Sequence, residues 1–144
     1  MRIKIFVDSS VLFAAILSAT GHARDLIRYA IAGRVQLVTS EYVLSEVTHN
    51  LAVKHPRVAY LLDQFVTEVA FEVIEATREE VLAAAEYTAL KDAPIVAAAV
   101  KARCDCLATF DRKHLLNPPE VAERSGLTIA TPGTIVKLLS EREE

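Results

Sequence analysis

The sequence predicts an α/β protein with a mainly parallel sheet that helices cover on both faces. Short β-rich runs alternate with longer segments whose apolar residues recur at helical spacing. One segment, Ala93 to Val100, is almost wholly apolar, which indicates a helix buried on nearly every face. Alternation of strands with buried helices is typical of a parallel sheet enclosed between two helical layers.

Length and composition favour one globular domain spanning residues 1–144. The 144 residues lie within the commonest domain size of about 100–150 residues. Apolar residues make up 52% and charged residues 24%, a balance that argues against disorder. The net charge of -3 gives no general attraction to nucleic acid, so a nucleic-acid substrate would need a local basic patch or metal ions.

The sequence favours a cytoplasmic protein with no membrane partner. No apolar run approaches the roughly 18 residues that span a membrane. Residues 1–4 and 11–17 imitate the basic and apolar parts of a signal peptide, but Asp8-Ser9-Ser10 interrupts them. Cys104 and Cys106 occupy alternate positions of one extended segment and are poorly placed to bridge each other, so we expect two core thiols in a reducing compartment.

The first 40 residues predict two strands and two helices. Ile3 to Val7 is a short β-rich run, and Asp8-Ser9-Ser10 offers a cap for a helix that continues to Leu17. A second helix covers residues 23–32, with Gly33 at its end. Residues 35–39 form the next strand.

The middle of the chain predicts three helices and one strand. Ser40 is a plausible N-cap for a helix that runs to about Lys54, and Pro56 restarts a helix through Phe65. The β-branched content of residues 69–74 favours a strand at an edge of the sheet. Thr77 to Glu80 fits a capping box, which predicts a helix from about Arg78 to beyond Tyr87.

The last third predicts the apolar helix after Asp92, two strands and two further helices. Residues 105–109 form a strand, and Asp111 caps a short helix through Leu116 that Asn117-Pro118-Pro119 breaks. Residues 127–130 form a last strand. Thr131-Pro132 then opens a helix to about Ser140 in the favoured order of cap and proline.

Four acids lie at positions where a parallel sheet places its functional site, beyond the carboxyl ends of the strands. Asp8 ends the first strand, and Asp111 follows the strand that ends at Thr109, so both lie at one rim. Glu46 lies on the border of the core face of its helix. Asp92 stands at the mouth of the apolar helix, and the sequence alone does not fix its side of the sheet.

Such an acidic cluster needs a counter-ion, and its oxygen ligands suit Mg²⁺ or Mn²⁺. Ser10 and Thr109 supply hydroxyls two residues from an acid, where they can bond a carboxylate or a bound water. The same acids also have a purely structural interpretation. Asp8, Asp92 and Asp111 each occupy an N-cap position, and a single helical glutamate such as Glu46 is more often a solvated or ion-paired residue than a metal ligand.

Four segments in order resemble the PIN domain, a family of metal-dependent ribonucleases, and especially its small stand-alone, VapC-like toxins. They are Phe6 to Leu12, Val38 to Val47, Lys91 to Ala99 and Leu107 to Leu115. The resemblance implies a three-layer α/β/α sandwich and identifies Asp8, Glu46, Asp92 and Asp111 with the family's acidic metal-binding quartet. Ser10 stands where the family often has asparagine. The resemblance also implies a small antitoxin as partner, and a homodimer.

The resulting hypothesis is hydrolysis of an RNA phosphodiester by a divalent ion that the quartet holds. Arg112 and Lys113 follow the last acid directly and can meet RNA phosphates, although a solvated helix start explains them equally well. The four histidines lack ligand-type spacing, which favours surface or packing roles. Two alternatives remain: a catalytically inactive PIN-like interaction module, and a receiver-type or phosphoryl-transfer domain, which would need a strand-borne lysine that no predicted strand supplies.

Overall fold

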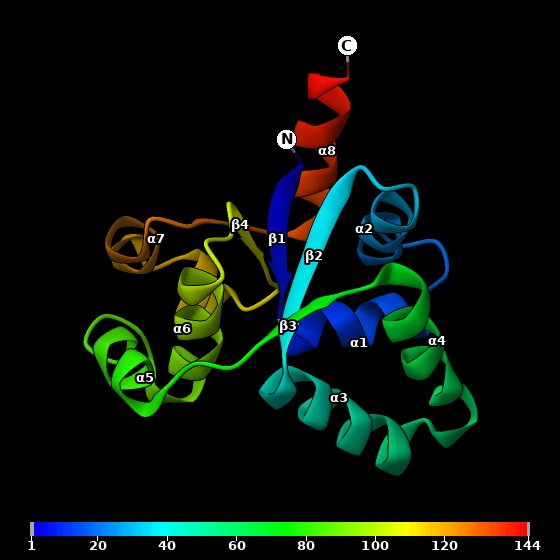
Figure 1. Cartoon of the computed structure of the whole chain (residues 1–144), viewed down its shortest axis with the longest axis horizontal. Coiled ribbons are helices and arrows are strands. Elements are labelled where there is room, and N and C mark those ends of the chain that lie inside the picture. The colour runs from blue at the N-terminus through cyan, green and yellow to red at the C-terminus, as the bar shows by residue number, and fades with distance from the viewer. Residues whose placement is uncertain (1, 144) are drawn as a thin grey trace.

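The computed structural model describes residues 2–143 as a five-stranded sheet between layers of helices (Figure 1). The strand order is β3-β2-β1-β4-β5, and every neighbouring pair is parallel. The α/β class with a parallel central sheet is therefore confirmed. The strands are β1 (Ile3–Val7), β2 (Val35–Ser40), β3 (Glu72–Ile74), β4 (Cys106–Ala108) and β5 (Thr128–Ala130).

Helices cover both faces of this sheet. In Figure 1, α5 and α6 lie on one side of β1 and β2, while α1, α2 and α4 lie on the other. The α-helices are α1 (Ser9–Leu17), α2 (His22–Ile31), α3 (Glu41–Lys54), α4 (Tyr60–Val69), α5 (Arg78–Ala84), α6 (Ala93–Lys101), α7 (Pro119–Ser125) and α8 (Pro132–Arg142). Three single turns complete the list: η1 (Pro56–Val58), η2 (Leu90–Asp92) and the π-type η3 (Arg112–Leu116). No helix among residues 2–143 is long and apolar enough to cross a membrane.

Short polar side chains set the starts of several helices, as the sequence predicts. The Ser40 hydroxyl accepts a hydrogen bond from the Val43 amide at 3.2 Å and caps α3. Thr77 and Glu80 form the predicted capping box of α5, in which each side chain accepts a bond from the other's backbone amide. These caps satisfy amides that have no partner within the helix.

Three predicted boundaries are wrong, each for a local reason. Helix α4 continues to Val69, because Leu62, Phe65 and Val69 bury one helical face, so β3 begins at Glu72 and not at Val69. Helix α5 ends at Ala84 and not beyond Tyr87, since the chain continues as turns with bonds between residues three apart, such as Tyr87 N to Ala84 O at 3.1 Å.

Helix α7 is a further element that the sequence does not predict. The Asn117-Pro118-Pro119 run does end η3, but Pro119 then occupies the first turn of α7, where a missing N–H leaves no helix bond unmade. Val121 buries against the core and Gly126, with φ at 79°, ends the helix in the left-handed region. The proline pair that the sequence analysis interprets as a helix break therefore also starts a helix.

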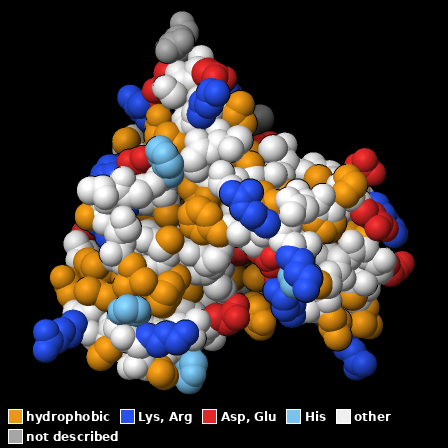
Figure 2. Space-filling model, turned by 180° about the vertical axis from the view of Figure 1, so that it is seen from behind, with side chains coloured by type: hydrophobic (Ala, Val, Ile, Leu, Met, Phe, Trp, Pro, Cys, Tyr) orange, Lys and Arg blue, Asp and Glu red, His pale blue; other side chains and the backbone are white. Residues whose placement is uncertain are grey.

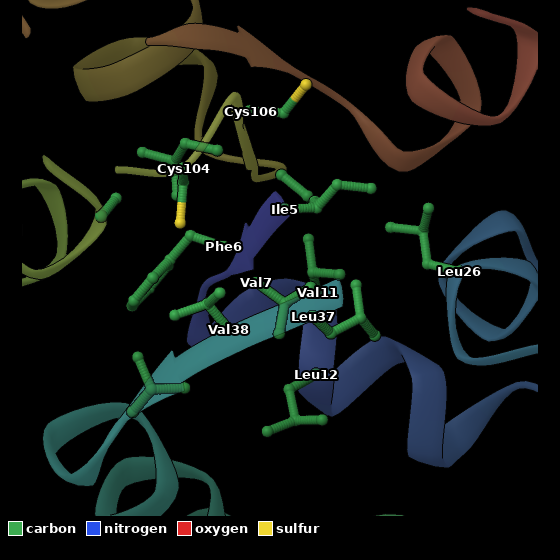
Figure 3. Close-up of a cluster of buried hydrophobic side chains, with 14 of the residues drawn as sticks. Ile5, Phe6, Val7, Val11, Leu12, Leu26, Leu37, Val38, Cys104 and Cys106 are labelled. Carbon is green, nitrogen blue, oxygen red and sulfur yellow. The ribbon is translucent and has the colours of Figure 1, made fainter. Parts of the chain in front are cut away.

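The core lies on both faces of the central strand β1. Figure 3 shows Phe6 on the side of Cys104 and Val38, and Ile5 on the opposite side towards Leu26. This alternation follows from the two-residue repeat of a strand. Helix α6 packs against β2, and its buried residues are Ala93, Ile95, Val96, Ala97, Ala98 and Ala99, which confirms the predicted buried apolar helix.

Both cysteines are buried free thiols, as the sequence predicts. Their sulfur atoms point in different directions in Figure 3. Burial raises the pKa of the Cys104 thiol to about 12, and burial also raises the pKa of the Cys106 thiol. Both side chains therefore serve as core residues.

Candidate metal centre

The strand order creates a crevice at the carboxyl ends of β1 and β4. From β1 the chain adds β2 and β3 on one side and then returns to place β4 and β5 on the other. Ligand sites of open parallel sheets form where the order reverses in this way. Asp8 directly follows β1 at this point, and the Asp8 amide donates to the Ala108 carbonyl of β4 at 3.3 Å.

All four predicted acids line one pocket of about 200 Å³ at this crevice. Asp8 follows β1, and Glu46 lies in the second turn of α3, which follows β2. Asp111 lies three residues beyond β4. Asp92 reaches the same rim because α6 leads directly into β4 and runs back along the sheet, so that its amino end lies at the carboxyl end of the strands. The other lining residues are Ser9, Ser10, Tyr42, Lys91 and Ile95.

The carboxylate of Asp8 is buried and fully hydrogen-bonded. The residue is 4% exposed, and Oδ1 accepts bonds from Ser10 Oγ at 2.7 Å and from the Val11 amide at 3.0 Å. Oδ2 accepts a short bond from Thr109 Oγ1. Burial raises the pKa of Asp8 above its ordinary value, while the three hydrogen bonds oppose that rise.

Ser10 and Thr109 connect the two loops that frame the crevice. Besides donating to Asp8, the Ser10 hydroxyl accepts a bond from the Phe110 amide at 3.2 Å. The Thr109 hydroxyl accepts a bond from the Asp111 amide at 3.0 Å. The two hydroxyls therefore fix the orientation of the Asp8 carboxylate and hold the β4 loop against the start of α1.

Asp92 differs from Asp8 because Lys91 is its one side-chain hydrogen-bond donor among the described residues, with Nζ donating to Oδ1 at 3.5 Å. Its side chain makes no capping bond to α6, although it stands at the N-cap position. The residue is 6% exposed, and its Oδ2 accepts no hydrogen bond, although Lys91 Nζ lies 3.2 Å away. Oδ2 is therefore balanced only by the Lys91 charge and by no hydrogen bond, so capping does not account for Asp92.

Asp111 is an N-cap that also faces the pocket. Its Oδ1 accepts a bond from the His114 amide at 3.0 Å, and its Oδ2 accepts one from Lys91 Nζ at 3.2 Å. Desolvation alone would raise the pKa of Asp111, but the bond from the His114 amide and the Lys91 charge outweigh it and lower the pKa. These contacts favour the ionised form of Asp111.

Glu46 is held by a residue that the sequence analysis assigned only to a helix cap. Ser9 Oγ donates to Glu46 Oε1 at 2.6 Å, across the junction of α1 and α3. Only the folded structure brings these two residues together, since 37 positions separate them in the chain. The bond directs Glu46 towards the pocket that Asp8 lines.

Lys91 and His114 are the other residues whose role at this site the sequence analysis missed. His114 Nδ1 lies 3.5 Å from Asp111 Oδ2. His114, Asp92 and Asp111 each offer one ligand atom, and these atoms lie within 4.8 Å of one another. The spacing of three residues between Asp111 and His114 in one turn was the available signal. Arg112 and Lys113 are exposed and are not among the residues that line the pocket.

A second, larger pocket of about 450 Å³ lies at the opposite rim. It is lined by residues at the starts of β1, β4 and β5 and along α8, among them Ile3, Cys106, Thr128 and Leu138. The amino ends of the strands meet there. This second pocket shares no lining residue with the acidic pocket, so the two are separate sites.

The donor set at the acidic pocket fits a hard divalent cation. Carboxylate oxygens from four elements converge on it, and Mg²⁺ and Mn²⁺ prefer oxygen ligands. The buried Oδ2 of Asp92, which accepts no hydrogen bond, is an oxygen that such an ion would satisfy. Asp8, Asp92, Asp111 and Glu46 line the pocket and could hold the ion, and His114 offers a further ligand atom beside Asp92 and Asp111.

Comparison with known proteins finds one matching family model and solved structures with a similar fold. A sequence model of the PIN domain matches residues 4–113. VapC20 of Mycobacterium tuberculosis, a sarcin-ricin loop cleaving toxin, is 22% identical over 76% of this chain and 91% of its own, with a TM-score of 0.55. PAE2754 from Pyrobaculum aerophilum is 20% identical over 96% of this chain and 90% of its own, with a TM-score of 0.65. FitAcB from Neisseria gonorrhoeae is 14% identical over 90% of this chain and 98% of its own, with a TM-score of 0.62. No curated protein matches the chain significantly.

Proposed function

Because this chain belongs to the PIN domain family, we propose that it is a metal-dependent endoribonuclease that hydrolyses RNA phosphodiester bonds. The observation that carries the proposal is the convergence of four carboxylates on one pocket at the reversal of strand order. The buried oxygen of Asp92 that lacks a hydrogen-bond donor supports a cation there. The interaction-module alternative accounts for Asp8 and Asp111 as caps, but it leaves the buried Asp92 Oδ2 with only the partly exposed Lys91 ammonium group as a partner.

In this proposal Asp8, Asp92 and Asp111 hold Mg²⁺ or Mn²⁺, and Glu46 completes the ligand shell. A divalent ion at such a site activates water and stabilises the leaving oxygen of a phosphodiester. Ser10 and Thr109 keep the Asp8 carboxylate in one orientation through their hydrogen bonds to its two oxygens. Ser9 does the same for Glu46. Preorganised ligands of this kind need no rearrangement when the substrate binds.

RNA attraction must be local in this protein. The net charge is -3, and Figure 2 shows acidic and basic side chains interspersed over one face of the described residues. Arg112 and Lys113 are exposed directly after Asp111. From there they can meet phosphates that flank the scissile bond, while the cation offsets the charge of the phosphate at the pocket.

The biological part of the proposal is that of a toxin in a toxin–antitoxin pair, acting in the cytoplasm. The structural likeness to VapC20, which is named a toxin, supports this role. The proposed partner is a small antitoxin that blocks the acidic rim, and a homodimer is the proposed assembly. Growth arrest on expression of the native chain, lost on expression of Asp92→Asn, is the expected result. Harmless expression of the native chain would contradict the toxin role.

The catalytic proposal is tested by cleavage of defined single-stranded RNAs in Mn²⁺ or Mg²⁺. Asp92→Asn is expected to lower kcat by about 100-fold or more, because it removes a ligand of the cation that would stabilise charge in the transition state. EDTA should abolish cleavage by the native chain. Asp63→Asn is the matched control, because Asp63 is an exposed aspartate on α4 outside the pocket. Equal cleavage by native and Asp92→Asn proteins would exclude the proposed mechanism.

A further inference from the structure

Lys91 lies between two of the proposed ligands of the cation. Its Nζ is 3.2 Å from Asp92 Oδ2 and 3.2 Å from Asp111 Oδ2. The Lys91 side chain is 59% exposed, whereas the Asp92 side chain is only 9% exposed. The ammonium group therefore enters the pocket from solvent and places one positive charge against the two carboxylates.

A divalent cation and this ammonium group need the same oxygens. Mg²⁺ binds its oxygen ligands at about 2.0–2.1 Å, so an ion on these two carboxylates would lie within a few ångströms of the present position of Nζ. Two positive charges at that separation repel each other strongly. Lys91 has four carbons between its backbone and its charge, and its exposure leaves room for the side chain to move away.

We propose that Lys91 is an internal counter-ion that holds Asp92 and Asp111 until the cation displaces it, and that the released ammonium group then binds a phosphate of the RNA. This inference rests on the proposed metal site. It assigns Lys91 two successive partners: the carboxylates in the metal-free protein and the substrate backbone in the loaded one. Tyr42 also lines the pocket, and His114 Nδ1 lies 3.5 Å from Asp111 Oδ2, but among the described residues Lys91 is the one that forms ion pairs with both carboxylates.

The exchange couples metal binding to RNA binding. Once the cation is bound, the Lys91 charge is free for a phosphate, and RNA that holds Lys91 removes the competitor of the cation. Each ligand therefore raises the affinity for the other, and by linkage the two factors are equal. In the metal-free protein, Lys91 stays paired with Asp92 and Asp111.

The first test is titration of the whole metal-free chain with Mn²⁺ by calorimetry, without RNA. Lys91→Met removes the competing charge and is expected to lower the Kd for Mn²⁺ by about three- to tenfold, as expected for releasing two partly exposed ion pairs. Lys91→Arg keeps a positive charge and should retain most of the native Kd. The matched control is Lys101→Met, because Lys101 pairs with Glu80 at 3.2 Å at the opposite end of α6. Its Kd should stay within about twofold of the native value.

The second test separates KM from kcat in cleavage of a single-stranded RNA at saturating Mn²⁺. Loss of one phosphate contact in Lys91→Met is expected to raise KM by about three- to tenfold with a smaller change in kcat. An unchanged Mn²⁺ Kd in Lys91→Met would overturn the counter-ion role, and an unchanged KM would overturn the transfer to RNA. Failure of the native chain and all variants to bind Mn²⁺ would instead overturn the metal site itself, and this inference with it.

Discussion

Asp8 and Asp92 are two buried aspartates of one pocket whose surroundings differ in hydrogen bonding. Three donors satisfy the two oxygens of Asp8, and two of these donors are hydroxyls that in turn accept backbone amides. Oδ2 of Asp92 accepts no hydrogen bond. The orientation of the Asp8 carboxylate is therefore fixed by hydrogen bonds, whereas Asp92 Oδ2 has only the ion pair with Lys91.

This difference predicts that the same substitution destabilises the fold at Asp8 more than at Asp92. In Asp8→Asn an amide hydrogen would face a donor, so the free energy of unfolding of the metal-free protein should fall by about 1–3 kcal/mol. Asp92→Asn loses only the partly exposed pair with Lys91, and its free energy of unfolding should stay within about 1 kcal/mol of the native value. Urea unfolding in EDTA measures both. A larger loss in Asp92→Asn than in Asp8→Asn would contradict the hydrogen-bond assignment.

At the scale of an element, α6 shows how packing places a ligand. Six of its nine residues are buried, and four of those six are alanines. Short side chains leave little room between the helix and its neighbours, so the position of the helix fixes that of Asp92 at its amino end. The site thus depends on residues that never touch a substrate.

Overpacking this helix should weaken both the fold and the site. Ala99 is 0% exposed, so Ala99→Leu is expected to lower the free energy of unfolding by about 1–3 kcal/mol. A shift of α6 should also raise the Kd for Mn²⁺. Urea unfolding and Mn²⁺ titration check the two effects, with Val100→Leu as control because Val100 is 41% exposed on the same helix. Equal stability of the two variants would show that α6 has space to spare.

Local signals predicted most elements but not their exact ends. Caps such as Ser40 and Thr77 and the spacing of apolar residues are properties of neighbouring residues, so the sequence displays them. The end of α4 depends on burial of Val69 by distant residues, and α7 depends on a proline pair with two opposite effects. These outcomes are decided by tertiary packing, which a single sequence does not display.

The residues of the candidate site were likewise predictable where local signals place them and unpredictable where tertiary packing does. Asp8 and Asp111 were predictable at one rim because each follows a strand. The edge of the sheet at which Asp92 lies depends instead on the direction of α6 relative to β4. Lys91 was visible beside Asp92, yet its contact with Asp111 spans 20 positions. The Ser9 contact with Glu46 likewise needs α1 and α3 to pack together. Their functional roles remain predictions.

At the scale of the whole molecule, the pocket joins segments from both halves of the chain. Asp8 and Glu46 come from the first half, and Asp92 and Asp111 come from the second. An unfolded chain separates these residues, so a cation bound to all of them binds only the folded state. Metal binding and global stability are therefore linked.

The linkage predicts that Mn²⁺ stabilises the entire domain. At a free Mn²⁺ concentration of about 100 times the Kd, the free energy of unfolding should rise by about 2.7 kcal/mol. Thermal or urea unfolding with and without Mn²⁺ measures the rise, which EDTA should reverse. Asp92→Asn should lose most of it, and Asp63→Asn should keep it. A rise of equal size in the native and Asp92→Asn proteins would point to Mn²⁺ binding elsewhere.

The two outer strands of the sheet have a consequence for assembly. Both β3 and β5 are only three residues long. An edge that short offers a foreign strand few backbone groups to pair with, which protects the protein from edge-to-edge aggregation. A partner that binds by adding a strand to the sheet would find few backbone groups with which to form hydrogen bonds. Tight recognition must therefore use side chains on the helices or at the crevice, where specificity is greater than along a bare backbone.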